Sequence, residues 1–451
     1  MKTKVVLPLM LLVVLGGMAT FTATTKWSSS RSIIKADGLI YFLYARSIVL
    51  DLDTDLTAEF REIESHFHEA AIAPAKHFME YNQKSGKIGF PFPIGTGILM
   101  APFYALGYGV EYLAASISGR TADSYGRIPI YGYGIGTLVY GLLGFWFMLT
   151  CCAQVANREV AYTSAIGIAF AGLIVFYVFF HPTMAHAPSF ALSSLFFLVW
   201  WRRWNDKSGR LFLLCFILGA LTAIRYQNIV LGILIAIIFV RDARQRAIRN
   251  IFRDAVVGVV AFVTPFSLQI YHWVGIHGSA VHDVGFGQSG GLVLEQNEMT
   301  FTSPNFLNVF FSCQHGLFYW TPVYVLGFLG LVWAARREKW AWAFLAAIFA
   351  NGFLIGSLGG PYNWSGGGLY GMRYLTECSA LLAVGLAVLI RDTRGIIRMQ
   401  WWWTLLGILI VWNGMLILAF SLREISQCDC VTFREMVVAM GNAIKRILAT
   451  R

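Results

Sequence analysis

The sequence predicts an all-α, polytopic membrane protein with about eleven transmembrane helices in a single domain, 1–451. Of the 451 residues, 57% are hydrophobic and only 13% are charged. The apolar residues form continuous runs close to the length of about 20 residues with which a helix crosses a bilayer. These runs lack the two-residue alternation of a membrane β-barrel, so we expect helices rather than strands.

The order of the predicted spans follows from these runs. The first run could be a signal peptide, but no small-x-small cleavage site follows it, which favours a retained signal-anchor helix. In chain order the predicted spans are 5–23, 128–152, 160–180, 188–201, 211–224, 228–240, 255–276, 317–335, 340–358, 375–390 and 401–420.

The apolar run 95–116 is ambiguous, because it is rich in glycine and contains a proline and a glutamate. If it does not span, the basic loops RRWNDKSGR, RDARQRAIRNIFRD, RREK and RDTRGIIR lie on the side of the N-terminal MKTK, as cytoplasmic loops usually do. The loop 277–316, which has no Lys or Arg, then faces outward. We therefore predict an interfacial or re-entrant helix at 95–116, within a long first outer loop over 24–127 that contains juxtamembrane helices.

The same topology accounts for the net charge of +11, because most of the excess lies in these loops. A nucleic-acid partner is therefore not expected. The N-terminus is predicted to be cytoplasmic, and the C-terminal tail 421–451, with a short amphipathic helix, external. The seven cysteines form no zinc pattern and no disulfide framework, and a redox role for Cys428 and Cys430 stays open.

Asp37 is the leading candidate for catalysis. It precedes the apolar stretch LIYFLYARSIVL, so it could simply cap a helix. It could also act at the membrane surface as a general base that deprotonates an acceptor hydroxyl. Tyr41 and Tyr44 would lie on one face of that helix, followed by Arg46, and these three are candidates for substrate binding.

Three aspartates alternate with other residues directly after this stretch. If the segment is extended, the carboxylates of Asp51, Asp53 and Asp55 point to one side and could hold a divalent cation such as Mg or Mn. A solvated acidic turn is the favoured alternative. We therefore expect either no cofactor or a divalent cation.

Three basic residues are candidates for binding a phosphate. Lys87 precedes Pro91 and Pro93, where it could pair with a lipid phosphate or merely extend to the membrane surface. Arg225 lies in a break between two apolar runs, and Arg373 follows a glycine-rich loop. An arginine at a membrane edge is energetically expensive and usually has an anionic partner.

Polar and aromatic residues gather in the other predicted outer loops. They could contact a sugar or a lipid, although an interfacial aromatic belt would have the same composition. The remaining candidates for substrate binding are His181, His186, Tyr226, Gln227, His315, Trp364 and Tyr370.

These patches together resemble the membrane-embedded glycosyltransferases of the GT-C class, above all bacterial relatives of protein O-mannosyltransferases and lipid A aminoarabinose transferases. The resemblance covers most of the chain. It is carried by an Asp after the first span with a Tyr four and an Arg nine residues later, by the Lys- and Pro-rich segment 87–93, and by the segments HGLFYWTP and WSGGGLYGMRYL.

The resemblance implies an inverting transfer of a sugar from a polyprenyl-phosphate donor to a glycan, lipid or protein acceptor. The reaction would take place on the outer face of a bacterial inner membrane. Asp37 would be the general base, and Lys87, Arg225 and Arg373 would hold the donor phosphate. Many relatives have a second acid where this chain has Gly38, and an acid in the second outer loop where it has HPTMAH. Metal dependence and the acceptor therefore stay open.

Two other functions remain as alternatives. A transporter or flippase of lipid-linked sugars usually shows paired repeats and polar residues at the membrane midplane, and neither is visible in this sequence. A non-catalytic subunit that assembles the cell envelope is the second alternative.

Overall fold

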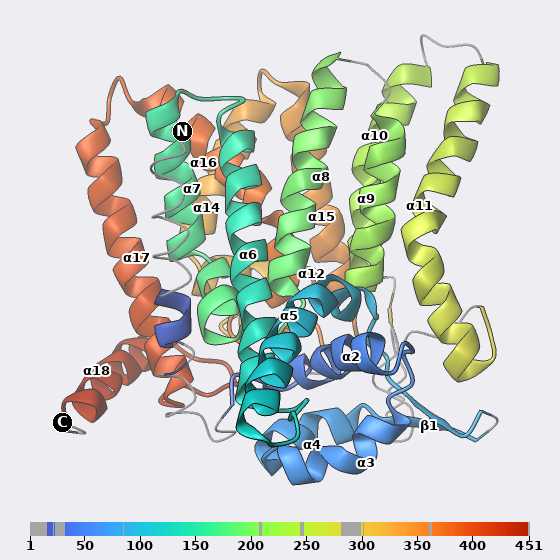
Figure 1. Cartoon of the computed structure of the whole chain (residues 1–451). Helices are drawn as coiled ribbons and strands as arrows, with labels where there is room; N and C mark the ends of the chain where they lie inside the picture. The colour runs from blue at the N-terminus through green and yellow to red at the C-terminus, as the bar shows by residue number, and fades with distance from the viewer. Residues whose placement is uncertain are drawn as a thin grey trace.

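The computed structural model describes residues 16–20, 22, 32–83, 85–206, 210–243, 248–280, 299–300, 302–359 and 363–449. Long helices stand side by side and run between two ends of the molecule (Figure 1). They are α6 (Arg127–Cys152), α7 (Arg158–Ala171), α8 (His186–Asp206), α9 (Leu211–Ile224), α10 (Gly232–Ala243), α11 (Ile248–His277), α14 (Val323–Ala335), α15 (Lys339–Gly356), α16 (Ser379–Thr393) and α17 (Met399–Ser421).

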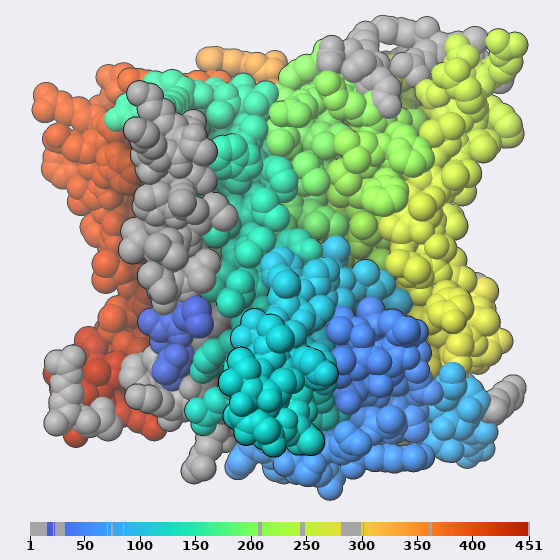
Figure 2. All heavy atoms as spheres, in the orientation of Figure 1, coloured from blue at the N-terminus to red at the C-terminus, as the bar shows by residue number. Residues whose placement is uncertain are grey.

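Shorter elements gather at one end of this bundle, which we call the site end (Figure 1). Figure 2 shows the chain from α2 to α5 as one continuous mass on that end. The predicted helical class is confirmed, apart from the antiparallel hairpin β1–β2. The elements are α2 (Gly38–Leu50), α3 (Thr57–His66), α4 (Glu69–His77), β1 (Glu80–Asn82), β2 (Lys87–Gly89), α5 (Gly95–Ser118), α12 (Phe306–Phe311), α13 (Leu317–Trp320) and α18 (Phe433–Ala449).

The arginine-rich loops meet at the opposite end, which we call the basic end. Their grouping agrees with the charge pattern of the sequence. Contacts at this end are Arg391 Nη1 to Val155 O, in the turn after α6, at 2.8 Å, Trp333 Nε1 to Asp392 Oδ2 at 3.1 Å, and the ion pair of Arg203 with Asp242.

α5, the helix at the predicted interfacial segment 95–116, lies at the site end beside α2 and the start of α6 (Figure 1). Its first turn packs on α2, since a Cβ at Gly97 would lie 2.5 Å from Tyr44 Cβ. Further along, a Cβ at Gly107 would lie 3.0 Å from the Cα of Pro129, at the start of α6. In Figure 1, α5 lies beside the site-end part of α6. Glycines therefore let this apolar helix approach its neighbours closely without crossing the bundle.

The predicted number of eleven spans is not confirmed. Within the described parts of the chain, seven helices are long and apolar enough to cross a membrane, and α5 is one of them. Several of the other predicted spans are shorter helices, such as α9 and α14, and the predicted span 5–23 lies mostly outside the described residues.

Three helical stretches break at the site end, and each break positions a candidate residue. The π-helical turn η1 (Phe176–Phe180) ends at His181. The 3-10 turn η2 (Tyr226–Leu231) begins after Arg225, and the 3-10 turn η3 begins with Arg373 (Arg373–Cys378). Breaks in buried helices leave backbone groups that need partners.

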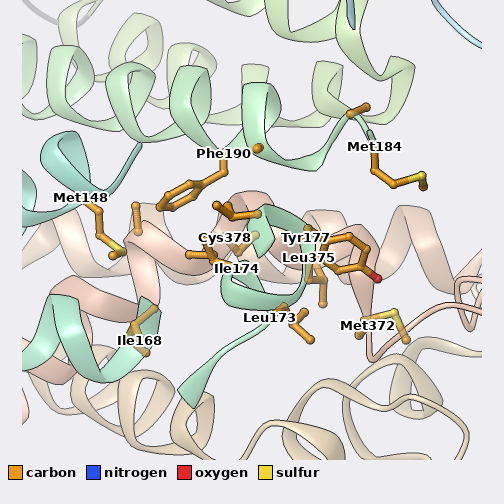
Figure 3. Close-up of a cluster of buried hydrophobic side chains, with 14 of the residues drawn as sticks. Met148, Ile168, Leu173, Ile174, Tyr177, Met184, Phe190, Met372, Leu375 and Cys378 are labelled. Carbon is orange, nitrogen blue, oxygen red and sulfur yellow. The ribbon is translucent and has the colours of Figure 1, made fainter. Parts of the chain in front are cut away.

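Asn413 supplies partners at the break in the predicted span 160–180. Its Nδ2 donates to Phe170 O and Gly172 O at 2.9 Å each. A packed apolar cluster lies next to the breaks, where Tyr177 of η1 and Leu375 of η3 lie close together (Figure 3). The turns that carry the site residues thus rest on a packed core.

A disulfide corrects one expectation. Cys313 and Cys430 are bonded, although they are 117 residues apart. Val431 N also donates to Cys313 O at 3.4 Å, so the chain after α17 returns to the turn that follows α12. Sequence spacing could not reveal this pair, because only the tertiary fold brings the two segments together.

Candidate functional site

Asp37 and Arg373 form the centre of the site. Arg373 Nη1 donates to Asp37 Oδ2 at 3.0 Å, and the two side chains are only 13% and 11% exposed. The Asp37 side chain makes no capping hydrogen bond to α2. Asp37 thus occupies the N-cap position of α2, as predicted, but its carboxylate is directed to a distant arginine rather than to the helix.

A second buried pair lies nearby. Arg225 Nη1 donates to Glu377 Oε1 at 2.8 Å and to His186 Nδ1 at 2.9 Å. Because an arginine only donates, the proton of a neutral His186 is on Nε2. Ser189 Oγ donates to the same Glu377 oxygen at 2.7 Å, and Asn228 Nδ2 donates to Ser189 Oγ at 2.9 Å. Arg225 is thus held by a network from three helical segments.

Tyr374 links the two pairs. The guanidinium carbons of Arg225 and Arg373 lie over its ring, 5.3 and 5.0 Å from the ring centre. Cations over an aromatic face are attracted by its electron density. Tyr41 is also close, since the charges of Asp37, Arg225 and Arg373 all act on it, and burial raises its pKa. The centre is therefore an array of two carboxylates, two guanidinium groups and tyrosines.

Lys35 and His181 add polarity beside this array. Burial, with a contribution from Arg423, lowers the pKa of Lys35 to about 8. The pKa of His181 is lowered to about 3, mainly by burial and then by the positive charges of Lys35 and Arg373. Its ring is therefore neutral near pH 7. Lys35 therefore carries a charge at neutral pH that mild alkali removes.

Several buried polar atoms around the array have no partner within the described part of the chain. They come from separate elements and retain hydrogen-bonding capacity for a polar ligand, because buried polar groups are normally paired. They are Arg373 Nε, Glu377 Oε2, His181 Nδ1 and Thr183 Oγ1.

Gly38 stands where many members of the family that the sequence resembles have a second acid, and the structure shows what fills that space. A Cβ at Gly38 would collide with the hydroxyl of Thr183 from the HPTMAH segment. The two departures from the family pattern are therefore coupled in space. Asp37 provides the carboxylate next to Gly38, and Arg373 forms an ion pair with it.

Lys87 and Arg46 have other partners. Lys87 lies on the hairpin, with Nζ 3.6 Å from Asp55 Oδ2 and a side chain that is 39% exposed. Arg46 binds Asp51 and Glu59 at 2.9 Å each and lies 4.7 Å from the centre of the Tyr125 ring. Arg46 thus joins α2 to α3 and to the segment before α6.

The three aspartates do not converge. Asp53 Oδ1 accepts from Ser47 Oγ at 2.7 Å, and Asp55 Oδ1 accepts from Thr57 N at the start of α3 at 3.0 Å. Asp51 pairs with Arg46. Among the residues that the structure describes, no group of three or more His, Cys, Asp or Glu could hold a metal ion.

The predicted aromatic and histidine residues divide into two groups. Tyr44 OH lies 3.4 Å from His272 Nε2, and the Tyr226 ring packs on Trp273 with centres 5.7 Å apart. The neighbouring Gln227 has a buried Nε2 with no partner among the described residues. These side chains line the edge of the site towards α11.

The second group is buried in the core. His315 Nδ1 donates to Ser365 O at 3.1 Å, and Tyr370 OH donates to Asn413 Oδ1 at 2.7 Å. Trp364 is 6% exposed and Tyr370 is fully buried. These residues hold the glycine-rich loop in place, and stacking on a sugar would require that loop to move.

Glu377 and Tyr374 were missed from the sequence. Glu377 follows Arg373 by four residues at the start of an apolar run, in RYLTEC. An isolated acid at a membrane edge is as expensive as an arginine there, so the same criterion could have found it. Lys35, two residues before Asp37, carried no such signal.

No family model matches the chain, and no curated protein matches it in sequence. Solved structures share its fold. ArnT from Cupriavidus metallidurans in the apo state has a TM-score of 0.53 and 12% identity, over 97% of this chain and 69% of that one. ArnT bound to undecaprenyl phosphate has a TM-score of 0.50 and 11% identity, over 97% and 75% of the two chains.

A more distant likeness is to the archaeal oligosaccharyltransferase AglB from Archaeoglobus fulgidus, in complex with an inhibitory peptide and a dolichol-phosphate. Its TM-score is 0.48 at 12% identity, and the match spans 97% of this chain but 55% of that one. The likeness to ArnT shows that the chain has the polytopic membrane fold of the GT-C glycosyltransferases.

Proposed function

We propose that this protein is a glycosyltransferase that moves a sugar from a polyprenyl-phosphate donor to an acceptor hydroxyl at the membrane surface. The observation that carries the proposal is the buried Asp37–Arg373 pair at the site end of a GT-C fold. ArnT, which has this fold, has been solved bound to undecaprenyl phosphate. A buried carboxylate beside two arginines suits a reaction that removes a proton and releases a phosphate.

In this mechanism Asp37 takes the proton of the acceptor hydroxyl as its oxygen attacks the anomeric carbon. The bond from that carbon to the phosphate oxygen breaks on the opposite side, which inverts the configuration. The departing polyprenyl phosphate gains one negative charge. A guanidinium near it stabilises the transition state more than the ground state, because the charge on the phosphate grows along the reaction.

The proposed orientation places the site end on the external face of a bacterial inner membrane. The arginine-rich loops at the basic end support it, since such loops are usually cytoplasmic. The Cys313–Cys430 disulfide at the site end also supports it, because disulfides persist in oxidising compartments. The two observations are independent and favour the same orientation.

We propose no resident cofactor. Arg373 already provides a positive charge next to Asp37, in the place where a metal ion would neutralise it. The acceptor would be a glycan, lipid or protein.

The test is a transfer assay on the purified full chain in proteoliposomes. A panel of undecaprenyl-phosphate sugars and a membrane extract as the source of acceptor would be supplied, with products read by mass spectrometry. We expect Asp37→Asn to lower the transfer rate at least about 100-fold, the usual scale for loss of a general base. Asp392→Asn, at the basic end, is the matched control and should retain activity.

Full transfer by the Asp37→Asn variant would overturn the assignment of the base. Movement of the lipid-linked sugar across the bilayer without any sugar transfer would instead support a flippase. Unchanged surface glycans after deletion of the gene, with loss of another envelope protein, would support an assembly subunit.

A further inference from the structure

The turn before α18 fixes the start of this helix at the site end. The Cys313–Cys430 disulfide ties that turn to the one after α12. Thr432 N donates to Glu435 Oε2 at 2.7 Å, and Glu435 N donates to Thr432 Oγ1 at 3.3 Å. This reciprocal capping box satisfies two backbone donors at the start of the helix. α18 therefore leaves the bundle at a fixed place, and Figure 1 shows it projecting sideways from the end of α17.

α18 has two apolar faces with different surroundings. One face is buried and packs against α17; it includes Met436, Ala439 and Ala443. The other is exposed, and its side chains recur at intervals of four, seven and four residues, which is the spacing of one helix face. This apolar stripe consists of Phe433, Val437, Ile444 and Leu448, which are between 45% and 65% exposed.

Phe433 shows which way the apolar stripe faces. Its ring stacks on Trp412 of α17, with ring centres 5.1 Å apart and the planes at 10°. Trp412 lies nine residues before Ser421, where α17 ends, and so about 13 Å back along that helix. The stripe that begins with Phe433 is therefore turned towards the middle of α17, a helix long and apolar enough to cross the membrane.

Arg446 marks the opposite side of α18. Its Nη1 donates to Leu422 O at 2.9 Å and to Glu424 Oε1 at 3.1 Å, both beyond the end of α17. Arg446 follows Ile444 by two residues and so lies about 200° further around the helix. α18 thus turns its stripe to the apolar part of α17 and its polar side to the chain beyond it. This is the orientation of an amphipathic helix that lies along a membrane surface.

The apolar stripe continues the lipid-facing surface of α17. Ile408 and Val411 of α17 are 62% and 64% exposed, and exposed apolar side chains on a spanning helix face the acyl chains. Phe433 meets this surface at Trp412. In Figure 2, α18 projects beyond α17 at the site end. The lipid that covers α17 therefore also covers the stripe, and no further partner is needed.

Arg434 and Lys445 add positive charge beside the stripe. Both are exposed, and they are eleven residues apart, which places them on the same side of α18. α18 has three basic residues and one acid, and that acid, Glu435, is held in the capping box. Cations next to an apolar stripe attract the headgroups of anionic lipids.

We propose that α18 is a membrane-surface helix that binds anionic phospholipids of the leaflet at the site end. The apolar stripe inserts among the acyl chains, and Arg434 and Lys445 bind the phosphate groups. Because both the disulfide and Arg446 fasten α18 to the bundle, it sets the depth of the site end relative to the membrane surface. Lipid binding by α18 is independent of the proposed sugar transfer.

The test attaches a fluorophore to single cysteines of the full chain in lipid nanodiscs. Cys428→Ser removes the partly exposed free thiol. Ile444→Cys then carries the label on the stripe, and Asn442→Cys, on the exposed polar side, is the matched control. Nitroxide on the acyl chains should quench the label of Ile444→Cys at least about threefold more than that of Asn442→Cys, and iodide in the water should quench them in the reverse order.

The same label measures the preference for anionic lipid. In nanodiscs with equal amounts of the two lipids, nitroxide on phosphatidylglycerol should quench Ile444→Cys about two- to fivefold more than nitroxide on phosphatidylcholine. Arg434→Gln with Lys445→Gln should bring this ratio close to one. The exchange Arg434→Lys with Lys445→Arg keeps both charges and should preserve the ratio, which makes it the control for the double variant.

Equal quenching of Ile444→Cys and Asn442→Cys by iodide would place the stripe in water and overturn the proposal. Shielding of Ile444→Cys from both quenchers would mean that protein covers the stripe, a second copy if the chains also cross-link there, and would overturn it as well. A lipid ratio close to one with Arg434 and Lys445 in place would refute the anionic preference. Leu448→Cys, on the same stripe, repeats each measurement if Ile444→Cys does not fold.

Discussion

The site end and the basic end both contain arginine–carboxylate pairs, but the pairs are built differently. At the basic end Arg391 pairs with its neighbour Asp392 at 2.7 Å, and Arg203 pairs with Asp242, 39 residues away. At the site end the partners come from more distant segments: Asp37 and Arg373 are 336 residues apart, and Arg225 and Glu377 are 152 residues apart. Adjacent pairs form from the local chain, whereas distant pairs exist only when the whole bundle has closed.

Burial distinguishes the site-end pairs from the Arg391–Asp392 pair, but not from the Arg203–Asp242 pair, whose side chains are 4% and 11% exposed. The side chains of Arg225 and Glu377 are 8% and 1% exposed, whereas that of Arg391 is 42% exposed. Charges are removed from water only at considerable cost. The exposed arginines of the basic end follow the charge bias of cytoplasmic loops, and the buried pairs of the site end belong to the proposed site.

The largest effect on stability should come from breaking one partner of a buried pair. Glu377→Gln leaves Arg225 buried with an uncompensated charge, which typically costs about 3–5 kcal/mol. Asp392→Asn at the basic end removes one partner of a surface pair and should cost less than about 1 kcal/mol. Thermal unfolding of the two variants in detergent measures this difference.

Equal unfolding temperatures for these two variants would remove the distinction between the two pairs.

The basic end was predictable from sequence because membrane topology depends on local charge. Four arginine-rich loops were assigned to one side, and in the structure they lie at the same end of the bundle (Figure 1). The same reasoning placed 95–116 at the site end. Arg225 and Arg373 were singled out because charged residues at the edges of apolar runs are expensive, and the structure places both over the Tyr374 ring.

The rest of the site depends on side-chain direction, which sequence spacing does not determine. Tyr41 lies at the array, whereas Arg46, five residues later on α2, points to α3. Lys87 was predicted to bind the donor phosphate because the segment 87–93 resembles one in the GT-C class. In the structure it lies on the β1–β2 hairpin, where it pairs with Asp55. Tyr370 was expected to meet a ligand, and packing against other aromatic rings buries it instead.

A second prediction concerns the covalent link that only the site end has. Replacing both Cys313 and Cys430 by Ser removes a cross-link between segments 117 residues apart. A lost disulfide typically costs about 2–4 kcal/mol. The unfolding temperature should fall, and a reducing agent should lower it for the wild type but not for the variant.

Cys428→Ser is the control for this variant, because Cys428 is a free thiol in the same turn. It should leave the unfolding temperature nearly unchanged. If reductant does not change the unfolding temperature of the wild type, the two cysteines are not bonded in the native protein. The proposed external orientation of the site end would then lose one of its two supports.

The smallest expected effect is a pH dependence that belongs to the site end alone. The pKa of Lys35 is about 8, lowered first by burial and then by Arg423, whereas the arginines of the basic end keep their charge throughout this range. As pH rises from 7 to 9, Lys35 loses its charge and the site attracts an anionic donor less strongly. We expect the KM for the donor to rise about two- to fivefold, while Lys35→Met shows a flat profile.

Stability should change in the opposite direction over the same range. Because the folded-state pKa is below the ordinary value of 10.5, the unfolded chain binds more protons between pH 8 and 10.5. Loss of the proton therefore favours the folded state, and the Lys35 contribution to stability rises with pH. A KM that rises while the unfolding temperature holds or increases identifies Lys35, whereas a parallel decline of activity and stability would indicate general alkaline unfolding and refute its role.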